Sequence, residues 1–226
     1  GPFFSHIAWT IPHANNELGR DTGNGMEVPE DAPYSGKPWP QVEKNFAAMI
    51  SRMDRDMGRL MELLRRRGLD ENTLVLFTSD NGPHKEGGHD AKFFESSGPL
   101  RGTKRDLYDG GIRVPTLARW PGMVPSGKAS DAVWAFWDLL PTFGELSGGR
   151  VPPGLDGQSI VPLLQGREQK AHEFLYWEFH ERGFTQGVRH ENWKAVRTGL
   201  KGKLELYDVT ADVGEKRDVA AAHPKV

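Results

Sequence analysis

One long stretch of the chain carries hydrophobic residues at helical spacing. From Val42 to Leu64 the apolar positions recur every three or four residues, which places them on one face of an α-helix. Gly68 follows as a helix stop. The pattern predicts an amphipathic helix over residues 42–64, and its methionines are expected to pack in the core.

Shorter apolar runs predict strands on either side of this helix. Residues 3–10, which are rich in aromatic side chains, and residues 114–120 each have the length and composition of a strand. Residues 73–78 form a continuous apolar run that is typical of a buried parallel strand. A helix over 138–146, capped by Asp138, continues the alternation. We therefore expect an α/β fold, a mixed sheet with helices on both faces.

Two regions depart from this alternation. Residues 14–40 are polar and contain scattered Gly, Asn and Pro, which predicts a long loop. After Gly166 come short strand-like runs separated by turn residues, which predict a small antiparallel sheet. These runs are 174–179, 186–189, 193–197 and 204–209. The expected organisation is a larger α/β unit over 1–168 and a small antiparallel subdomain over 169–226.

Composition removes several classes of function. The 226 residues carry 29 basic and 31 acidic side chains, a formal net charge of −2, so no long-range field attracts nucleic acid or anionic lipid. No apolar run reaches the roughly 18 residues that span a bilayer, so membrane insertion is not expected. The chain contains no Cys, so a bound metal must use oxygen or imidazole ligands.

Oxygen ligands gather after the run at 73–78. Asp80 and Asn81 stand where that strand should end, and the carboxyl ends of strands are where α/β sheets bind ligands. A carboxylate beside a carboxamide suits a hard divalent cation. Two alternatives stay open: an Asx turn in which Asp80 caps the next residues, and a zinc site that combines Asp80 with His84, His89 and Asp90.

Basic residues follow in a Gly-rich segment. Arg101, Lys104 and Arg105 among glycines provide the positive charge and close backbone approach of an anion site, although such residues are also common on solvated loops. His13 stands just after the predicted first strand and is open to either a catalytic or a purely structural interpretation.

Four motifs in order resemble the carboxyl-terminal half of the formylglycine-dependent sulfatases, the arylsulfatase-like branch of the alkaline phosphatase superfamily. They are Thr-Ser-Asp-Asn-Gly-Pro at 78–83, Gly-Pro-Leu-Arg-Gly-Thr-Lys at 98–104, Leu-Tyr-Asp-Gly-Gly-Ile-Arg-Val-Pro at 107–115 and Trp-Pro-Gly at 120–122. Weaker similarity extends over nearly the whole chain. The resemblance implies an alkaline-phosphatase-like α/β sandwich that hydrolyses sulfate esters.

The resemblance also implies roles for individual residues. Asp80 and Asn81 would be two ligands of a calcium ion, and Lys104 would contact the sulfate group. His13 would contact the sulfate or its leaving oxygen. His84 and Lys85 would contact the substrate. Arg101 and Arg105 are expected to hold the loop in place.

The family's nucleophile is not matched. It is a formylglycine made from Cys or Ser in a Cys/Ser-x-Pro-x-Arg element near the start of the family's proteins, and paired aspartates supply further metal ligands there. Ser97 fits the bare pattern, but it follows the metal pair and lacks the downstream Thr-Gly, so we interpret it as a coincidental match. The chain is expected to be a fragment with half an active site. Its missing upstream segment would supply the formylglycine.

The expected substrate is a sulfated small molecule or carbohydrate. Trp39, Trp177 and Trp193 are open to two interpretations, a sugar-stacking platform or core and interdomain packing. Two other functions stay open: a phosphate or phosphonate monoesterase of the same superfamily, and a carbohydrate-binding homologue without catalysis. Sulfatases of this kind are commonly exported, so a periplasmic or secreted location is expected.

Overall fold

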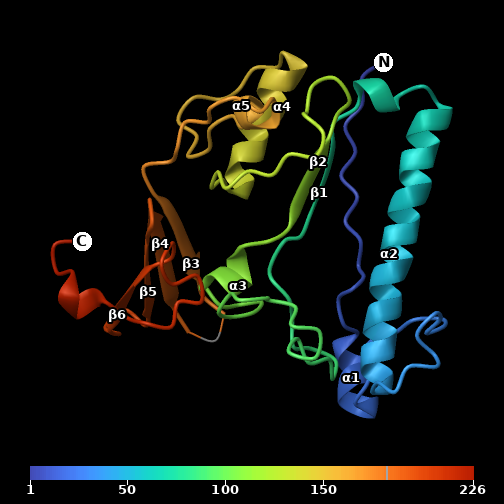
Figure 1. Ribbon diagram of the computed structural model, residues 1–226, viewed down its shortest axis with the longest axis horizontal. Helices are drawn as coiled ribbons and strands as arrows, with labels where there is room; N and C mark the ends of the chain where they lie inside the picture. The colour runs from blue at the N-terminus through green and yellow to red at the C-terminus, as the bar shows by residue number, and fades with distance from the viewer. Residues whose placement is uncertain (182) are drawn as a thin grey trace.

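The computed structural model describes residues 1–181 and 183–226 and has the expected α/β class. Its larger elements before the carboxyl-terminal sheet lie in the order α1 (Asn16–Thr22), α2 (Gln41–Arg66), β1 (Val75–Thr78), α3 (Asp109–Ile112), β2 (Thr116–Arg119), α4 (Leu139–Ser147) and α5 (Val161–Leu164). The sheet itself consists of β3 (Leu175–Phe179), β4 (Thr185–His190), β5 (Trp193–Thr198) and β6 (Leu204–Asp208). Figure 1 shows α2 on one side of β1 and β2, with α4 and α5 on the other side.

The long helix is confirmed. α2 ends at Arg66, and Gly68 follows with a φ of +65°, a conformation that suits glycine. Its amino-terminal half buries Phe46 and Met49 in a small core with Ala14 and Met26. This core lies beside the loops that carry the candidate site, so it fixes their position.

The strand over 73–78 exists, but the predicted parallel pairing is wrong. β1 pairs antiparallel with β2, with Val75 opposite Arg119 and Thr78 opposite Thr116. All four residues of β1 are only partly buried. A continuous apolar run specifies burial on both faces, but it does not specify the direction of the neighbouring strand.

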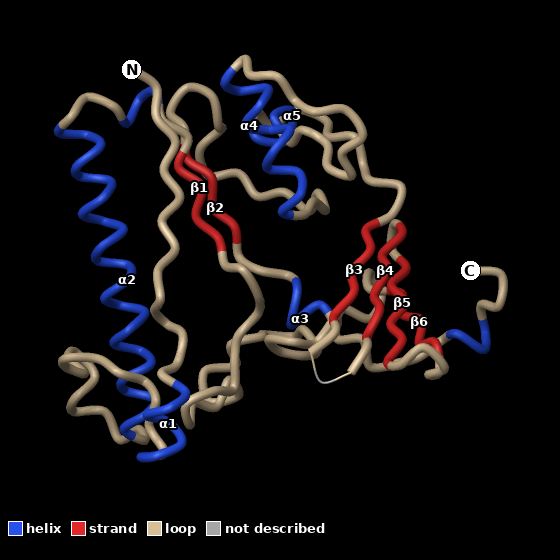
Figure 2. Tube along the Cα trace, turned by 180° about the vertical axis from the view of Figure 1, so that it is seen from behind, coloured by secondary structure: helices blue, strands red, loops and turns tan. Residues whose placement is uncertain are grey.

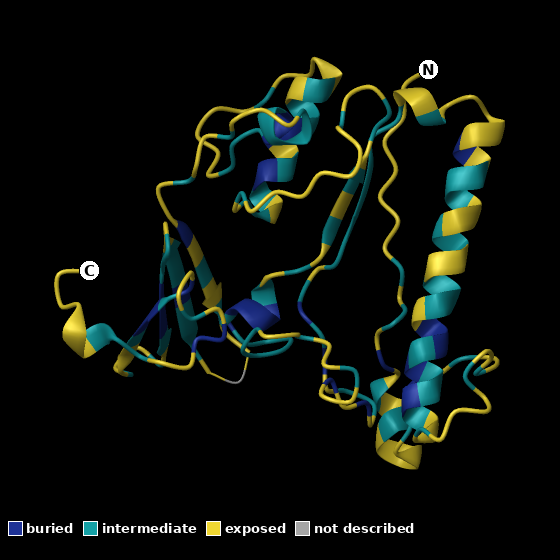
Figure 3. Cartoon of the chain, in the orientation of Figure 1, coloured by how far each residue is buried: buried dark blue, intermediate teal, exposed yellow. Residues whose placement is uncertain are grey.

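The first predicted strand is also wrong. Residues 3–10 run extended beside α2 without strand hydrogen bonding, and most of them are exposed (Figure 3). Phe4 meets Phe143 of α4 and Trp9 meets Phe77 of β1 through their rings, yet the Phe4 side chain stays 74% exposed. An apolar sequence favours a strand, but a strand forms only where a neighbour supplies the hydrogen bonds.

The predicted loop over 14–40 contains a short helix. Asn15 caps α1, because its Oδ1 accepts a hydrogen bond from the Leu18 N–H at 3.0 Å. Gly23 ends the helix with a φ of +75°. The segment was predicted to be irregular because its Gly, Asn and Pro are typical of loops, but two of these residues are the helix's caps.

The helix over 138–146 is present as α4, but Asp138 does not cap it with its side chain. The Asp138 carboxylate is fully buried and accepts hydrogen bonds from the backbone N–H groups of Ala135 and Gln158. It also contacts the His172 ring at 2.9 Å. Asp138 therefore joins the start of α4 to later loops.

The carboxyl-terminal antiparallel sheet is confirmed, with the strand order β3-β4-β5-β6 (Figure 2). α3 lies between this sheet and the β1–β2 pair in both views of the chain. Trp177 of β3 packs against Trp137 with ring centroids 5.8 Å apart, which favours the packing interpretation of this side chain. In the part of the chain that the structure describes, no helix is both long and apolar enough for a bilayer.

A buried ion cluster fastens α3 to the sheet. Lys194 of β5 is fully buried, and its Nζ lies 2.5 Å from Asp109 Oδ1 and 3.3 Å from Glu215 Oε1. Glu215 also accepts a hydrogen bond from the Asp109 N–H at 2.7 Å. Burial raises the pKa of Glu215, and the Lys194 ammonium opposes that effect.

Candidate functional site

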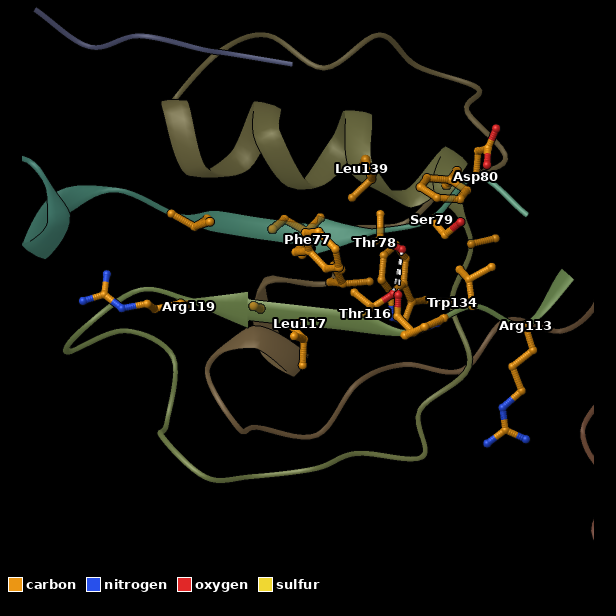
Figure 4. Close-up of a pocket in the computed structure, with 18 of the residues that line it drawn as sticks. Phe77, Thr78, Ser79, Asp80, Arg113, Thr116, Leu117, Arg119, Trp134 and Leu139 are labelled. Carbon is orange, nitrogen blue, oxygen red and sulfur yellow. Dashed lines mark hydrogen bonds between the residues drawn. The ribbon is translucent and has the colours of Figure 1, made fainter. Parts of the chain in front are cut away.

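The predicted metal ligands follow β1 directly. β1 ends at Thr78, and Asp80 follows at the Thr78–Thr116 end of the strand pair, away from Arg119 (Figure 4). Asp80 is exposed and Asn81 is half-buried. The Asn81 Nδ2 donates to the Gly82 carbonyl at 2.8 Å, which leaves its Oδ1 as the atom suited to bind a cation.

This donor set fits part of a calcium site. Asp80 and Asn81 offer two neighbouring oxygen atoms, whereas calcium takes about six to eight. Within residues 1–181 and 183–226, no group of three or more Asp, Glu or His side chains is arranged to hold a metal ion. These two residues can therefore contribute to a hard-cation site, but the other ligands must come from elsewhere.

The structure brings His13 and Lys104 together. The Lys104 Nζ lies 2.8 Å from His13 Nε2, although 91 positions separate the two residues. The His13 Nδ1 donates to the Ala14 carbonyl at 2.9 Å, which orients the ring so that Nε2 faces the lysine. The Lys104 N–H donates to the Pro83 carbonyl at 2.8 Å, so the basic loop lies along the residues that follow the metal pair.

A carboxylate completes this group. Glu86 Oε2 lies 3.0 Å from Lys104 Nζ and 3.4 Å from His13 Nε2, and Glu86 Oε1 accepts from Arg105 Nη1 at 2.7 Å. Partial burial favours a higher pKa for Glu86, but hydrogen bonds from Arg105 and Lys104 outweigh it and hold the pKa at about 2. Glu86 is therefore ionised across the working pH range.

Sequence reasoning did not single out Glu86. It follows two basic residues in the run His-Lys-Glu-Gly-Gly at 84–88, and an acidic residue in a Gly-rich loop usually indicates a solvated position. The signal that favours a role is its place in the same loop as the metal pair. The Arg105 side chain, which Glu86 contacts, also binds Glu181 at 2.9 Å.

His84 is held by the chain itself. Its Nδ1 accepts from the Glu86 N–H at 3.1 Å, so the proton is on Nε2, which donates to the Pro12 carbonyl at 2.9 Å. The ring is 7% exposed, and burial lowers its pKa. With both nitrogens used, His84 links the Glu86 loop to the segment before His13 and is not arranged as a zinc ligand. Lys85 is exposed, and its substrate contact stays a prediction.

Arg101 and Ser97 hold the basic loop. The Arg101 guanidinium stacks 3.6 Å from the Tyr108 ring centroid and donates to the Tyr207 hydroxyl and the Glu215 carbonyl. The Ser97 Oγ donates to the Gly102 carbonyl at 2.9 Å. Arg101 thus has the structural place that its sequence context favours, and Ser97 is engaged in loop structure.

Trp39 lies in an aromatic cluster. Tyr34 stacks on it at 5.7 Å between centroids, and the Phe93 and Phe94 rings meet it edge-on. Trp193 of β5 contacts His223 with ring centroids 4.9 Å apart. The packing interpretation accounts for these contacts without a bound sugar.

Gly82 allows the loop of Asp80 and Asn81 to touch α3, and this contact gives a testable prediction. A Cβ at Gly82 would lie 1.9 Å from the Gly110 carbonyl oxygen, so Gly82→Ala is expected to lower the free energy of unfolding by about 1–3 kcal/mol. Gly58, an open position in α2, is the matched control. Gly58→Ala should raise that free energy by about 0.5–1 kcal/mol, as urea unfolding would measure. Equal, small effects at both positions would contradict the close approach.

Comparison with known proteins shows which families the chain resembles. A family model described as Sulfatase matches residues 1–149, and one described as N-sulphoglucosamine sulphohydrolase, C-terminal, matches residues 102–225. The steryl-sulfatase of Mus musculus is 37% identical over 156 residues, which cover 67% of this chain and 25% of that protein. The chain thus spans about a quarter of this relative's length.

Solved structures agree on the fold. The crystal structure of Ps i-CgsB in complex with k-i-k-neocarrahexaose superposes with a TM-score of 0.78 at 29% identity, over 95% of this chain and 45% of that one. The phosphonate monoester hydrolase of Agrobacterium radiobacter superposes with a TM-score of 0.62 at 25% identity, over 81% of this chain and 38% of that one.

Proposed function

The chain belongs to the sulfatase family, and on that premise we propose that it supplies part of an active site that hydrolyses sulfate esters. The observation that carries the proposal is the meeting of Lys104 and His13 beside the loop of Asp80 and Asn81. An ammonium, an imidazole and two oxygens suited to a metal ion are part of what a sulfuryl transfer needs, and the nucleophile must be added to them.

Hydrolysis of a sulfate ester converts ROSO₃⁻ and water into ROH and hydrogen sulfate, and negative charge develops on the leaving oxygen. In this proposal the Lys104 ammonium binds a sulfuryl oxygen and stabilises charge that grows in the transition state. In this proposal His13 passes a proton from Nε2 to the leaving oxygen as the S–O bond breaks, a step for which Nε2 must first have taken up that proton, and the Nδ1–H bond to the Ala14 carbonyl holds the ring in place.

Asp80 and Asn81 would hold the calcium ion, which when bound neutralises charge on sulfuryl oxygens. Their half of the site is built by β1 and by the backbone contact between Gly82 and Gly111 at 2.9 Å. No step is assigned to a formylglycine here, because the chain contains no Cys and Ser97 is bonded within its own loop.

The isolated chain is expected not to turn over sulfate esters, since covalent catalysis needs an activated nucleophile. The test compares the purified chain with the complete sulfatase that carries this sequence, using an aryl sulfate and the matching aryl phosphate. Faster turnover of the sulfate by the complete protein supports the proposal. Preference for the phosphate would favour the monoesterase alternative, and turnover by the chain alone, abolished by Asp80→Ala, would return attention to Ser97.

The finer assignments belong to the same proposal. The proposed substrate class is a sulfated carbohydrate, which is supported by the similar structure of BT4656 in complex with its substrate D-Glucosamine-2-N, 6-O-disulfate. The complete protein would act in the periplasm or outside the cell. The division into a larger unit over 1–168 and a smaller one over 169–226 is likewise proposed. Limited proteolysis that cleaves near residue 168 and leaves a folded larger piece would support that boundary.

A further inference from the structure

The free site already contains an anion. Glu86 places its carboxylate against Lys104 and Arg105, at 3.0 and 2.7 Å, and within 3.4 Å of His13. A planar carboxylate and a tetrahedral sulfate both carry negatively charged oxygens that accept hydrogen bonds from the same N–H donors. The side chains of Glu86 and Lys104 are only 14% and 18% exposed, so the contact between them is largely shielded from water.

The charges of this group cancel. Lys104 and Arg105 carry two positive charges, and Glu86 and Glu181, which both contact Arg105, carry two negative charges. An arriving sulfate therefore meets no net positive charge unless one carboxylate moves away from its cation.

Glu86, and not Glu181, is the carboxylate that occupies the position expected for the sulfate. Its Oε2 contacts the Lys104 ammonium, the group that the proposed function assigns to the sulfate, whereas Glu181 is paired with Arg105. Lys104 and Glu86 are both carried by loops outside the regular helices and strands, so the carboxylate and the ammonium can separate without breaking a helix or a strand.

We propose that Glu86 is an internal counter-anion that occupies the sulfate position of the free site and is displaced from Lys104 when sulfate binds. The inference rests on the proposed function and adds the state of the site before substrate arrives. Displacement costs binding energy, so the substrate must offer contacts beyond its sulfate group to bind tightly. The device thereby favours a large sulfated ligand over free inorganic sulfate.

A change of pH cannot neutralise Glu86, because its pKa of about 2 keeps the carboxylate charged wherever the protein is assayed. The test is therefore mutational and uses the 226-residue chain with inorganic sulfate as the probe. Sulfate titrations followed by the NMR resonances of the His13 ring give a dissociation constant for each variant. Glu86→Gln keeps the shape and removes the charge. Glu181→Gln is the matched control, since it removes the same charge from the other side of Arg105.

Glu86→Gln is expected to tighten sulfate binding by roughly tenfold to a hundredfold, because a charge-assisted competitor is lost. Glu181→Gln should change it by less than about threefold, the effect of a partly exposed charge. Unchanged or weaker binding in Glu86→Gln would mean that Glu86 only positions Lys104, and equal tightening in both variants would mean a general charge effect. Either result overturns the inference, as does an absence of sulfate binding in all variants.

A second measurement keeps the test decisive if Glu86→Gln does not fold. In the unaltered chain, saturating sulfate should shift the Glu86 carboxyl carbon resonance, and an unshifted resonance overturns displacement. The proposed function is judged separately by turnover of the complete sulfatase. Tighter sulfate binding without turnover leaves the inference standing and removes the function, whereas turnover with unchanged Glu86→Gln binding does the reverse.

Discussion

Lys104→Ala in the complete sulfatase is expected to lower kcat by about 10²- to 10³-fold, the loss typical of one preorganised donor in a water-poor site. The ammonium stands within hydrogen-bond distance of both His13 and Glu86, so its removal leaves the sulfuryl oxygens without this donor. The metal pair lies on a different loop, so calcium affinity should change little. Added calcium should not restore the rate.

Asp80→Ala is the comparison that gives this result its meaning. It removes a charged metal ligand, so the calcium concentration needed for half-maximal rate should rise, and excess calcium should restore part of the activity. Turnover measured across a calcium titration separates the two variants. A Lys104→Ala enzyme with a nearly unchanged rate, or one that calcium restores as it restores Asp80→Ala, would contradict the division of roles.

Lys194→Met is expected to lower the free energy of unfolding by about 3–5 kcal/mol, a large share of the roughly 5–15 kcal/mol that holds a domain together. The substitution keeps most of the side chain's bulk but removes the ammonium, which leaves Glu215 as a buried carboxylate without its cation and Asp109 with the more distant Arg189 at 3.7 Å. Urea unfolding at pH 7 measures the loss. Lys203→Met is the control, because the exposed Lys203–Asp218 pair is screened by water and its loss should change the free energy of unfolding little.

The pH dependence of this variant gives a second check. A carboxyl whose pKa is raised in the folded state favours folding while it is protonated. The free energy of unfolding therefore falls as the pH rises above the pKa of the unfolded state and through the pKa of the folded state. Burial already raises the pKa of Glu215, and loss of Lys194 removes the opposing cation. The deficit of Lys194→Met should therefore shrink as the pH is lowered toward the ordinary range of Glu. A deficit that grows on acidification would contradict this account.

Local patterns predicted the elements whose stability is local. The three- and four-residue spacing sufficed for α2, and short runs between turn residues sufficed for the antiparallel sheet, because adjacent strands joined by turns find each other without distant help. The predicted strand over residues 3–10 was wrong because their apolar character predicts burial but does not specify a partner strand. The predicted parallel pairing of β1 was wrong for the same reason, since its partner β2 lies about forty residues further along the chain.

The site shows the same division. The motifs that resemble sulfatases pointed to His13 and Lys104, which no periodicity could have joined across 91 residues. Glu86 and Lys194 were missed because single charged residues in a loop or a strand normally face solvent. Their positions are decided by opposite charges from distant segments, and only the folded chain shows those charges.

The exposed apolar surface has a practical consequence for handling the chain. Phe4, Leu117 and Leu140 are 74%, 68% and 55% exposed, and they lie in the extended segment 3–10, in β2 and in α4 respectively. A formal charge of −2 and an isoelectric point near 6.5 provide little mutual repulsion at neutral pH. Concentrated preparations are therefore expected to aggregate. Buffers well away from pH 6.5 at low ionic strength should keep the protein monodisperse.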